Sequence, residues 1–305
     1  MGRISGTSVR RREDDRILRG QGQFVDDLDP PGTAHAAIVR SPFAHAEVGE
    51  IHVPPDLPGV IAVLTAADLE GRARPAPAWD IPTVSVVHDL HPILATDEVR
   101  YVGQQVAAVV AETRAQAEDA ADLIEVDYEP LDPVLSASES HTELMRWEWV
   151  GGEVEAAFER ADHVAVSTNR LPRVISAAME TRGALAAYDA EADLLTVWIS
   201  AQDTHRPLKD LAHMLDRPDD AIRVVVPDVG GAFGVKGNPG PEVAIAALAS
   251  MDLGRPVKWT EDRRESFLAT WQGRDMEATV ELALSSAGDM LGIRARITAD
   301  IGAYV

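Results

Sequence analysis

The sequence contains no cysteine, and this absence excludes several kinds of site. Disulfides, thiolate zinc sites, cysteine nucleophiles and cysteine-held iron–sulfur clusters all need a thiol, which none of the 305 residues provides. Any redox centre bound by this chain must therefore be held by other groups.

Positive charge and long apolar runs are also scarce. The chain has 28 Lys and Arg against 50 Asp and Glu, a formal net charge of -22, which disfavours binding to nucleic acid or to anionic membranes. No run approaches the roughly 18 apolar residues of a membrane span, and charged residues follow Met1–Gly6 where a secretory signal would be apolar. We expect a cytoplasmic protein with no membrane span, whose partners are small molecules or proteins.

The pattern of apolar residues predicts an α+β fold in two domains. In the first, Gln105–Ala111 is a candidate buried strand, Thr113 can cap a following amphipathic helix, and Glu125–Tyr128 is a second strand. We expect these three elements to form one strand–helix–strand unit. A polar stretch at 136–152 breaks the pattern, so the predicted domains are 14–136 and 150–305.

The second domain has its own pattern of strands and helices. The sequence predicts strands at 194–200 and 222–226, a helix ending before Arg217-Pro218, an apolar helix at 242–251, and a hairpin of 276–284 with 290–300. In the last strand Ile293 and Ile297 alternate with polar residues, so one face is apolar. We expect that face, or an open strand edge, to be exposed to water in this chain.

A glycine-rich segment, Gly230–Gly237, lies between a predicted strand and helix. Its backbone amides could converge on an anion at the helix N-terminus, but the segment fits neither a Walker A loop nor G-x-G-x-x-G. From glycine content alone, a tight turn is favoured over a ligand cradle. Gln202 follows the end of a strand, where α/β folds place ligand contacts, yet a structural role is also the default for it.

Other candidate motifs are incomplete. Gly20–Val25 lacks the third glycine of a dinucleotide fingerprint, and Pro30-Pro31 interrupts the spacing of a calcium loop after Asp26–Asp29. Both segments are interpreted as turns. The histidines, including His88 and His91, form no H-E-x-x-H motif and are expected on the surface or in packing.

Taken in order, several segments resemble the large subunit of the molybdenum hydroxylases, the family of xanthine dehydrogenase, aldehyde oxidase and aerobic carbon monoxide dehydrogenase. Tyr101–Ala111 is similar to the core of that family's α/β hammerhead domain, and Leu18–Asp27 to its start. Met179–Ala184 is similar to the family's M-E-P-R-G/A segment, with Thr181 in the proline position. The resemblance also covers Gln202, Gly230–Gly234, Arg255–Arg263 and Asp300–Tyr304.

The resemblance implies a hammerhead domain followed by the first part of an α/β molybdenum-cofactor-binding domain. It implies that Gln202 places its amide near an apical oxygen ligand of molybdenum, while backbone amides around Phe233 and Gly234 hold the metal's ligand sphere from the other side. Gly231 and Ala232 complete the expected cofactor-binding set. The implied cofactor is molybdenum-molybdopterin, either without a nucleotide or in the cytosine dinucleotide form.

The resemblance also implies a function and partners. The expected reaction is oxidative hydroxylation of an aldehyde, an N-heterocycle or carbon monoxide, with water as the oxygen source. Lys236 is followed by Gly237 where purine hydroxylases commonly have glutamate, which puts xanthine as substrate in doubt. The iron–sulfur clusters and FAD are expected on partner subunits.

No catalytic residue is assigned within this chain. By resemblance, the arginine-bearing loop, most pterin contacts and the glutamate that acts as general base lie beyond Val305, in a C-terminal remainder that would be a further partner. Two hypotheses stay open: part of a molybdenum-dependent oxidoreductase, incomplete as a single chain, or a non-catalytic binding or assembly protein derived from such a subunit.

Overall fold

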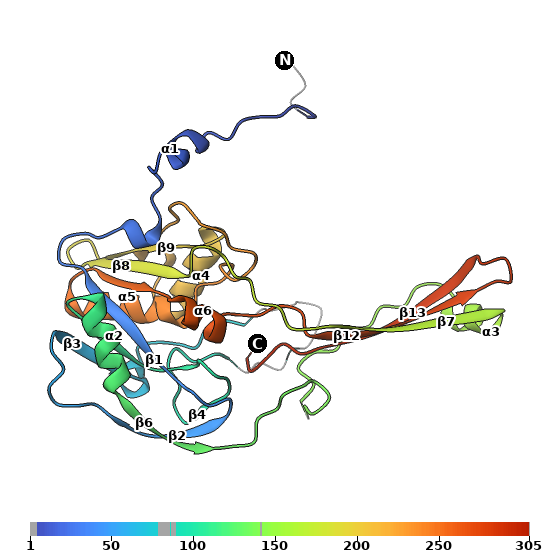
Figure 1. The fold of residues 1–305 in the computed structure, drawn as a ribbon, viewed down its shortest axis with the longest axis horizontal. Coiled ribbons are helices and arrows are strands. Elements are labelled where there is room, and N and C mark those ends of the chain that lie inside the picture. The colour runs from blue at the N-terminus through green and yellow to red at the C-terminus, as the bar shows by residue number, and fades with distance from the viewer. Residues whose placement is uncertain (1–4, 79–85, 87–89, 141, 305) are drawn as a thin grey trace.

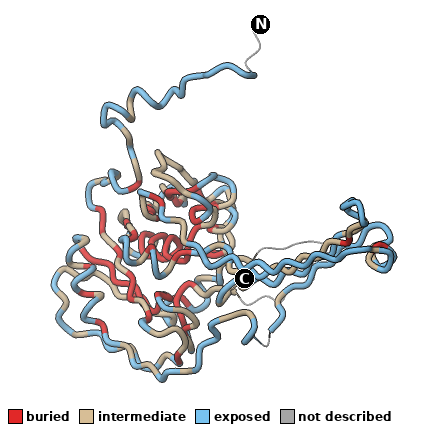
Figure 2. Tube along the Cα trace, turned by 45° about the vertical axis from the view of Figure 1, so that its right-hand side comes forward, coloured by how far each residue is buried: buried red, intermediate tan, exposed pale blue. Residues whose placement is uncertain are grey.

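The computed structural model describes residues 5–78, 86, 90–140 and 142–304, and His88 lies outside them. A body of packed sheets and helices carries a long arm, which is a three-stranded sheet. The N-terminal segment leaves the body on another side (Figure 1). Buried residues concentrate in the body, whereas the arm is largely exposed (Figure 2). The predicted α+β character is confirmed.

A seven-stranded mixed sheet forms the centre of the body. Its order is β10-β9-β8-β11-β1-β5-β3. The strands are β1 (Ala34–Arg40), β3 (Val60–Thr65), β5 (Gln105–Ala111), β8 (Gly183–Asp189), β9 (Leu194–Ile199), β10 (Ile222–Val225) and β11 (Val257–Thr260). Strands β1 and β11 pair in parallel, with Ala34 opposite Val257. One sheet therefore contains strands from both of the domains that the sequence predicts.

Helices cover both faces of this sheet, which explains why β5 is buried along its whole length. Ala107 and Val109 pack with helix α2 (Arg114–Leu123), whereas Ala108 and Val110 join the larger core that contains α5 (Pro241–Leu253). Thr113 caps α2 by accepting the backbone N–H of Gln116, as the sequence predicts. Helix α4 (His205–Met214) packs against β10.

A second, three-stranded sheet has the order β4-β2-β6. It consists of β2 (Ala46–His52), β4 (Glu98–Val99) and β6 (Glu125–Pro130). The prediction of a single strand–helix–strand unit is wrong in one respect, because β5 and β6 lie in different sheets. Alternating apolar residues identify a strand but not the sheet that it joins.

The arm is a three-stranded sheet of order β13-β12-β7. The hairpin of β12 (Met276–Leu284) and β13 (Met290–Ala299) is confirmed, and β7 (His163–Leu171) adds a third strand that the sequence analysis missed. Ile293 and Ile297 are 54% and 63% exposed, so the apolar face expected to be open to water is open. Helix α3 (Val154–Glu159) packs on β13.

The remaining helices are short: α1 (Asp14–Leu18) and α6 (Arg263–Ala269), with 3-10 turns at Val25–Asp27, Ala66–Leu69 and Asp219–Ala221. Arg16 forms an ion pair with Asp228, which lowers the pKa of that carboxyl to about 2. This pair joins the N-terminal segment to the loop after β10. No helix among the described residues is long and apolar enough to cross a membrane.

Candidate functional site

Gln202 and the glycine-rich loop, which are 32 positions apart, meet directly in the structure. The side-chain oxygen Oε1 of Gln202 accepts the backbone N–H of Gly234 at 3.0 Å. The backbone N–H of Gln202 donates to the carbonyl of Lys236 at 2.9 Å. Two hydrogen bonds, one donated in each direction, therefore hold the segment after β9 against the loop, and the two form one surface.

The loop has a left-handed backbone at three of its four central residues. Gly231, Phe233 and Gly234 have φ of 99°, 54° and 107°. Such angles suit glycine but are unusual for phenylalanine, whose ring is 77% exposed. Ser176 Oγ donates to the carbonyl of Phe233 at 3.0 Å and helps to hold this conformation. A strained, exposed residue held by its surroundings is typical of a functional loop.

The surface offers hydrogen-bond donors. In the part of the chain that the structure describes, the backbone N–H groups of Gly231, Ala232 and Phe233 have no acceptor, and neither does the side-chain NH₂ of Gln202. Turns of this kind typically present successive N–H groups to an anion or an oxygen ligand. The donor set therefore fits the oxygen-rich ligand sphere of a metal–pterin cofactor.

A cavity of about 320 Å³ adjoins this surface. It is lined by Gln202, Arg206, Gly234, Gly237, Asn238 and Trp271. Glu242, in the first turn of α5, places a carboxylate of the chain itself at the N-terminus of that helix.

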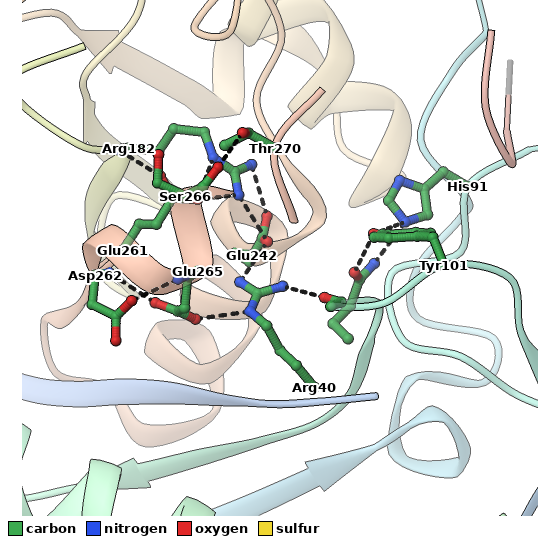
Figure 3. Close-up of polar contacts among 12 residues, drawn as sticks. Arg40, His91, Tyr101, Arg182, Glu242, Glu261, Asp262, Glu265, Ser266 and Thr270 are labelled. Carbon is green, nitrogen blue, oxygen red and sulfur yellow. Dashed lines mark hydrogen bonds and ion pairs between the residues drawn. The ribbon is translucent and has the colours of Figure 1, made fainter. Parts of the chain in front are cut away.

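A buried cluster of charged side chains was missed from the sequence and is shown in Figure 3. Arg182 pairs with Glu261 at 2.7 Å and with Glu242 at 3.2 Å, and Arg40 pairs with Glu242 at 2.9 Å and with Glu265 at 2.8 Å. Burial opposes ionisation of Glu242, but the charges of Arg182 and Arg40 outweigh it and hold its pKa at about 2. The ion cluster joins β1, β8, β11, α5 and α6.

Arg182 connects this ion cluster to the cavity. Its guanidinium carbon lies 5.3 Å from the ring centre of Trp259 and 5.7 Å from that of Trp271, which lines the cavity. Cation–π contacts at such distances fix the ring position. Glu242, a charged residue at the start of an otherwise apolar helix, was the available indication in the sequence.

His91 has the packing role that the sequence analysis allowed. Its ring stacks on Tyr304 at 4.7 Å. Its Nε2 forms hydrogen bonds with the Tyr101 hydroxyl and with the side-chain nitrogen of Gln105, both at 3.1 Å. Burial lowers its pKa to about 4. A neutral, enclosed imidazole of this kind is a structural group.

The two incomplete motifs near the N-terminus have structural contacts. Lys258 Nζ donates to the carbonyls of Asp26 and Leu28, and Thr260 Oγ donates to the Asp26 carboxylate. No group of three or more potential metal ligands occurs among the described residues. The segment thus packs against β11, which belongs to the second predicted domain.

Family models match two parts of the chain. Residues 19–132 match the a/b hammerhead domain of aldehyde oxidase and xanthine dehydrogenase, and residues 136–305 match the molybdopterin cofactor-binding domain. The nicotine 6-hydroxylase large subunit of Paenarthrobacter nicotinovorans is 37% identical over 99% of this chain and 38% of its own length. The carbon monoxide dehydrogenase large chain of Afipia carboxidovorans is 36% identical over 98% of this chain and 40% of its own.

Solved structures agree with these matches. Quinoline 2-oxidoreductase from Pseudomonas putida 86 has a TM-score of 0.85 at 36% identity, covering 96% of this chain and 39% of that chain. The chain spans about two fifths of the length of these relatives. It belongs to the xanthine dehydrogenase, aldehyde oxidase and carbon monoxide dehydrogenase family of molybdenum-cofactor-binding large subunits, and it matches their N-terminal portion.

Proposed function

We propose that this chain forms part of the cofactor wall in the large subunit of a molybdenum hydroxylase. Gln202, Gly231, Ala232, Phe233 and Gly234 would contact the cofactor, with Gln202 and Phe233 nearest to the metal. The observation that carries the proposal is the Gln202–Gly234 hydrogen bond, because it places a side-chain amide and a row of unpaired backbone donors on one surface.

The chemistry of these groups is binding and orientation. When bound, a molybdenum-molybdopterin cofactor supplies the redox chemistry of hydroxylation. The Gln202 NH₂ and the loop N–H groups would donate to its oxygen ligands, and such contacts orient and tune a metal without ligating it. None of the five residues can act as a general base, so proton transfer is assigned to no residue here.

The substrate proposal is an aldehyde, an N-heterocycle or carbon monoxide. Among the relatives, one is named a nicotine 6-hydroxylase, another a carbon monoxide dehydrogenase and a third a quinoline 2-oxidoreductase. All three names are those of enzymes, which does not favour the non-catalytic alternative. We propose that partner subunits carry the iron–sulfur clusters and FAD and that the remainder of the large subunit joins them in the cytoplasm. This chain has no cysteine and so offers no thiolate ligand for such clusters.

The test is isolation of the complex from its native host through an affinity tag on this chain. We expect molybdenum and a pterin at close to one per chain, with iron and FAD on other polypeptides. The released pterin should be either molybdopterin without a nucleotide or its cytosine dinucleotide form. Activity with the three substrate classes in ¹⁸O-labelled water would place labelled oxygen in the product. A complex that contains neither molybdenum nor pterin would overturn the proposal.

A further inference from the structure

One carboxylate oxygen of Glu180 accepts three hydrogen bonds, one from the segment before Gln202 and two from the glycine-rich loop. Its Oε2 accepts Ser200 Oγ, the backbone N–H of Gly230 and Lys236 Nζ, each at 2.7 Å. Ser200 lies two residues before Gln202, whereas Gly230 and Lys236 lie at the two ends of the glycine-rich loop. Glu180 therefore ties together the segments that form the candidate cofactor surface.

The backbone of Glu180 also lies close to the loop. The N–H of Glu180 donates to the carbonyl of Gly230 at 3.1 Å. A Cβ on Gly230 would lie 2.5 Å from the Cβ of Glu180, a distance that real side chains do not reach. The start of the loop thus approaches Glu180 as near as a residue without a side chain allows.

The positive charge that pairs with Glu180 is buried. Lys236 is only 1% exposed. Burial lowers its pKa, which the hydrogen bond and charge of Glu180 oppose. A buried ammonium without its carboxylate is strongly unfavourable, so loss of Glu180 would force Lys236 to move or to lose its proton.

The second oxygen of Glu180 matters for the choice of variants. Oε1 is buried and has no hydrogen-bond partner among the described residues. In Glu180→Gln, the side-chain oxygen can keep the Oε2 position and accept the same donors, while the NH₂ takes the position of Oε1. Glutamine thus keeps an acceptor for the three donors but removes the negative charge that pairs with Lys236, whereas alanine removes both the acceptor and the charge.

We propose that Glu180 is the positioning residue of the cofactor wall. It touches neither cofactor nor substrate; it fixes Gln202 and the N–H groups of Gly231, Ala232 and Phe233 at one mutual spacing by holding Ser200, Gly230 and Lys236. The claim about geometry stands on the hydrogen bonds of this chain, and the claim about cofactor binding rests on the proposed function.

The first experiment measures geometry in the 305-residue chain without cofactor. Hydrogen exchange in peptides covering 200–204 and 230–237 should be at least tenfold faster in Glu180→Ala than in the wild type, with Glu180→Gln between the two. Glu265→Gln, which removes a buried carboxylate charge from the ion cluster, should leave these peptides unchanged. Equal exchange in all four proteins would overturn the proposal, and if the alanine variant does not fold, the glutamine variant decides.

The second experiment measures molybdenum per chain in the complex from the native host. We expect Glu180→Ala to lower molybdenum content at least fivefold and Glu180→Gln to recover part of it, with the Mo(V) electron paramagnetic resonance spectrum of the residual metal altered. Full molybdenum and an unchanged spectrum in both variants would sink the cofactor part of the inference. Faster exchange in a protein whose wild type contains no molybdenum would instead reject the proposed function and retain the positioning role.

Discussion

Arg182 donates three hydrogen bonds to the carboxylate of Glu261. The guanidinium donates to Oε1 at 2.7 and 3.0 Å, and the backbone N–H of Arg182 donates to Oε2 at 3.0 Å. The Glu261 side chain is fully buried, so its charge depends on this one cation for compensation within the ion cluster. The pair joins β8 to the end of β11 and brings the guanidinium beneath Trp271.

We expect Arg182→Met to lower the free energy of unfolding by about 3 to 5 kcal/mol, the usual cost of leaving a buried charge unpaired. Urea unfolding followed by tryptophan fluorescence measures this. The control is Arg146→Met, which removes an exposed ion pair with Glu143 and should leave stability unchanged within error. A loss as small in Arg182→Met as in the control would show that the ion cluster contributes no net stability.

Stability should also fall as the pH is lowered from 6.5 to about 4, because of His91. Burial lowers the pKa of His91 from 6.5 to about 4, so in this window the unfolded chain binds a proton that the folded chain does not. Unfolding is then favoured as pH falls, by on the order of 3 kcal/mol across the window for this group.

The check is urea unfolding at pH 7 and pH 5 for the wild type and for His91→Gln. The variant should lose less stability on acidification than the wild type. His35, whose pKa is lowered chiefly by burial, acts in the same direction, so His35→Gln provides a comparison at a less enclosed site. Identical pH dependence in the wild type and His91→Gln would contradict the assignment.

Replacing Gln202 should separate its two contacts. In the assembled enzyme, Gln202→Ala removes both the acceptor for Gly234 and the NH₂ donor, and we expect turnover per molybdenum to fall about tenfold or more. Gln202→Glu keeps an acceptor for Gly234 but has no NH₂, so it should lose turnover while the loop stays ordered. The exposed side chain follows its strand, and the thermal midpoint should change little in either variant.

A matched control for both is Gln21→Ala, which changes an exposed glutamine of the N-terminal segment and should leave turnover unaltered. Wild-type turnover in Gln202→Ala at full molybdenum content would mean that Gln202 does not contact the cofactor.

Several elements were predictable because their determinants are local. Thr113 and the apolar run before it define β5 and α2, and the turn Ser285–Gly288 defines the β12–β13 hairpin. The prediction failed where the partner is remote. Nothing within 163–171 indicates that β7 pairs with β12, since all nine of its residues are exposed.

The candidate site divides in the same way. Gln202 and the Phe233 loop were identified through a resemblance, and the structure brings them into contact, but no local pattern indicates that Glu180 faces Lys236. Their contact depends on how β8, β9 and the loop fold over one another. The ion cluster was missed for the same reason, because Arg40 and Glu242 are charged residues in apolar surroundings whose partners lie far away in sequence.

The arm should make the isolated chain self-associate. Its outer strands β7 and β13 have unpaired edges in the described part of the chain, and β13 exposes Ile293 and Ile297. We expect Ile297→Lys to raise the monomer fraction in size-exclusion chromatography with light scattering. Thr298→Lys, which adds the same charge to the opposite face of β13, is the control. A monomer at every concentration, or an equal effect of the two lysines, would argue against association through this face.

The parallel pairing of β1 with β11 also constrains how the chain folds during synthesis. Ala34 and Val257 are more than two hundred positions apart, so β1 leaves the ribosome long before the strand that completes its hydrogen bonding exists. Pairing at such separation is slow because a long loop must close first. The early-made half of the sheet therefore spends much of translation with an open edge, the kind of surface through which partly folded chains aggregate.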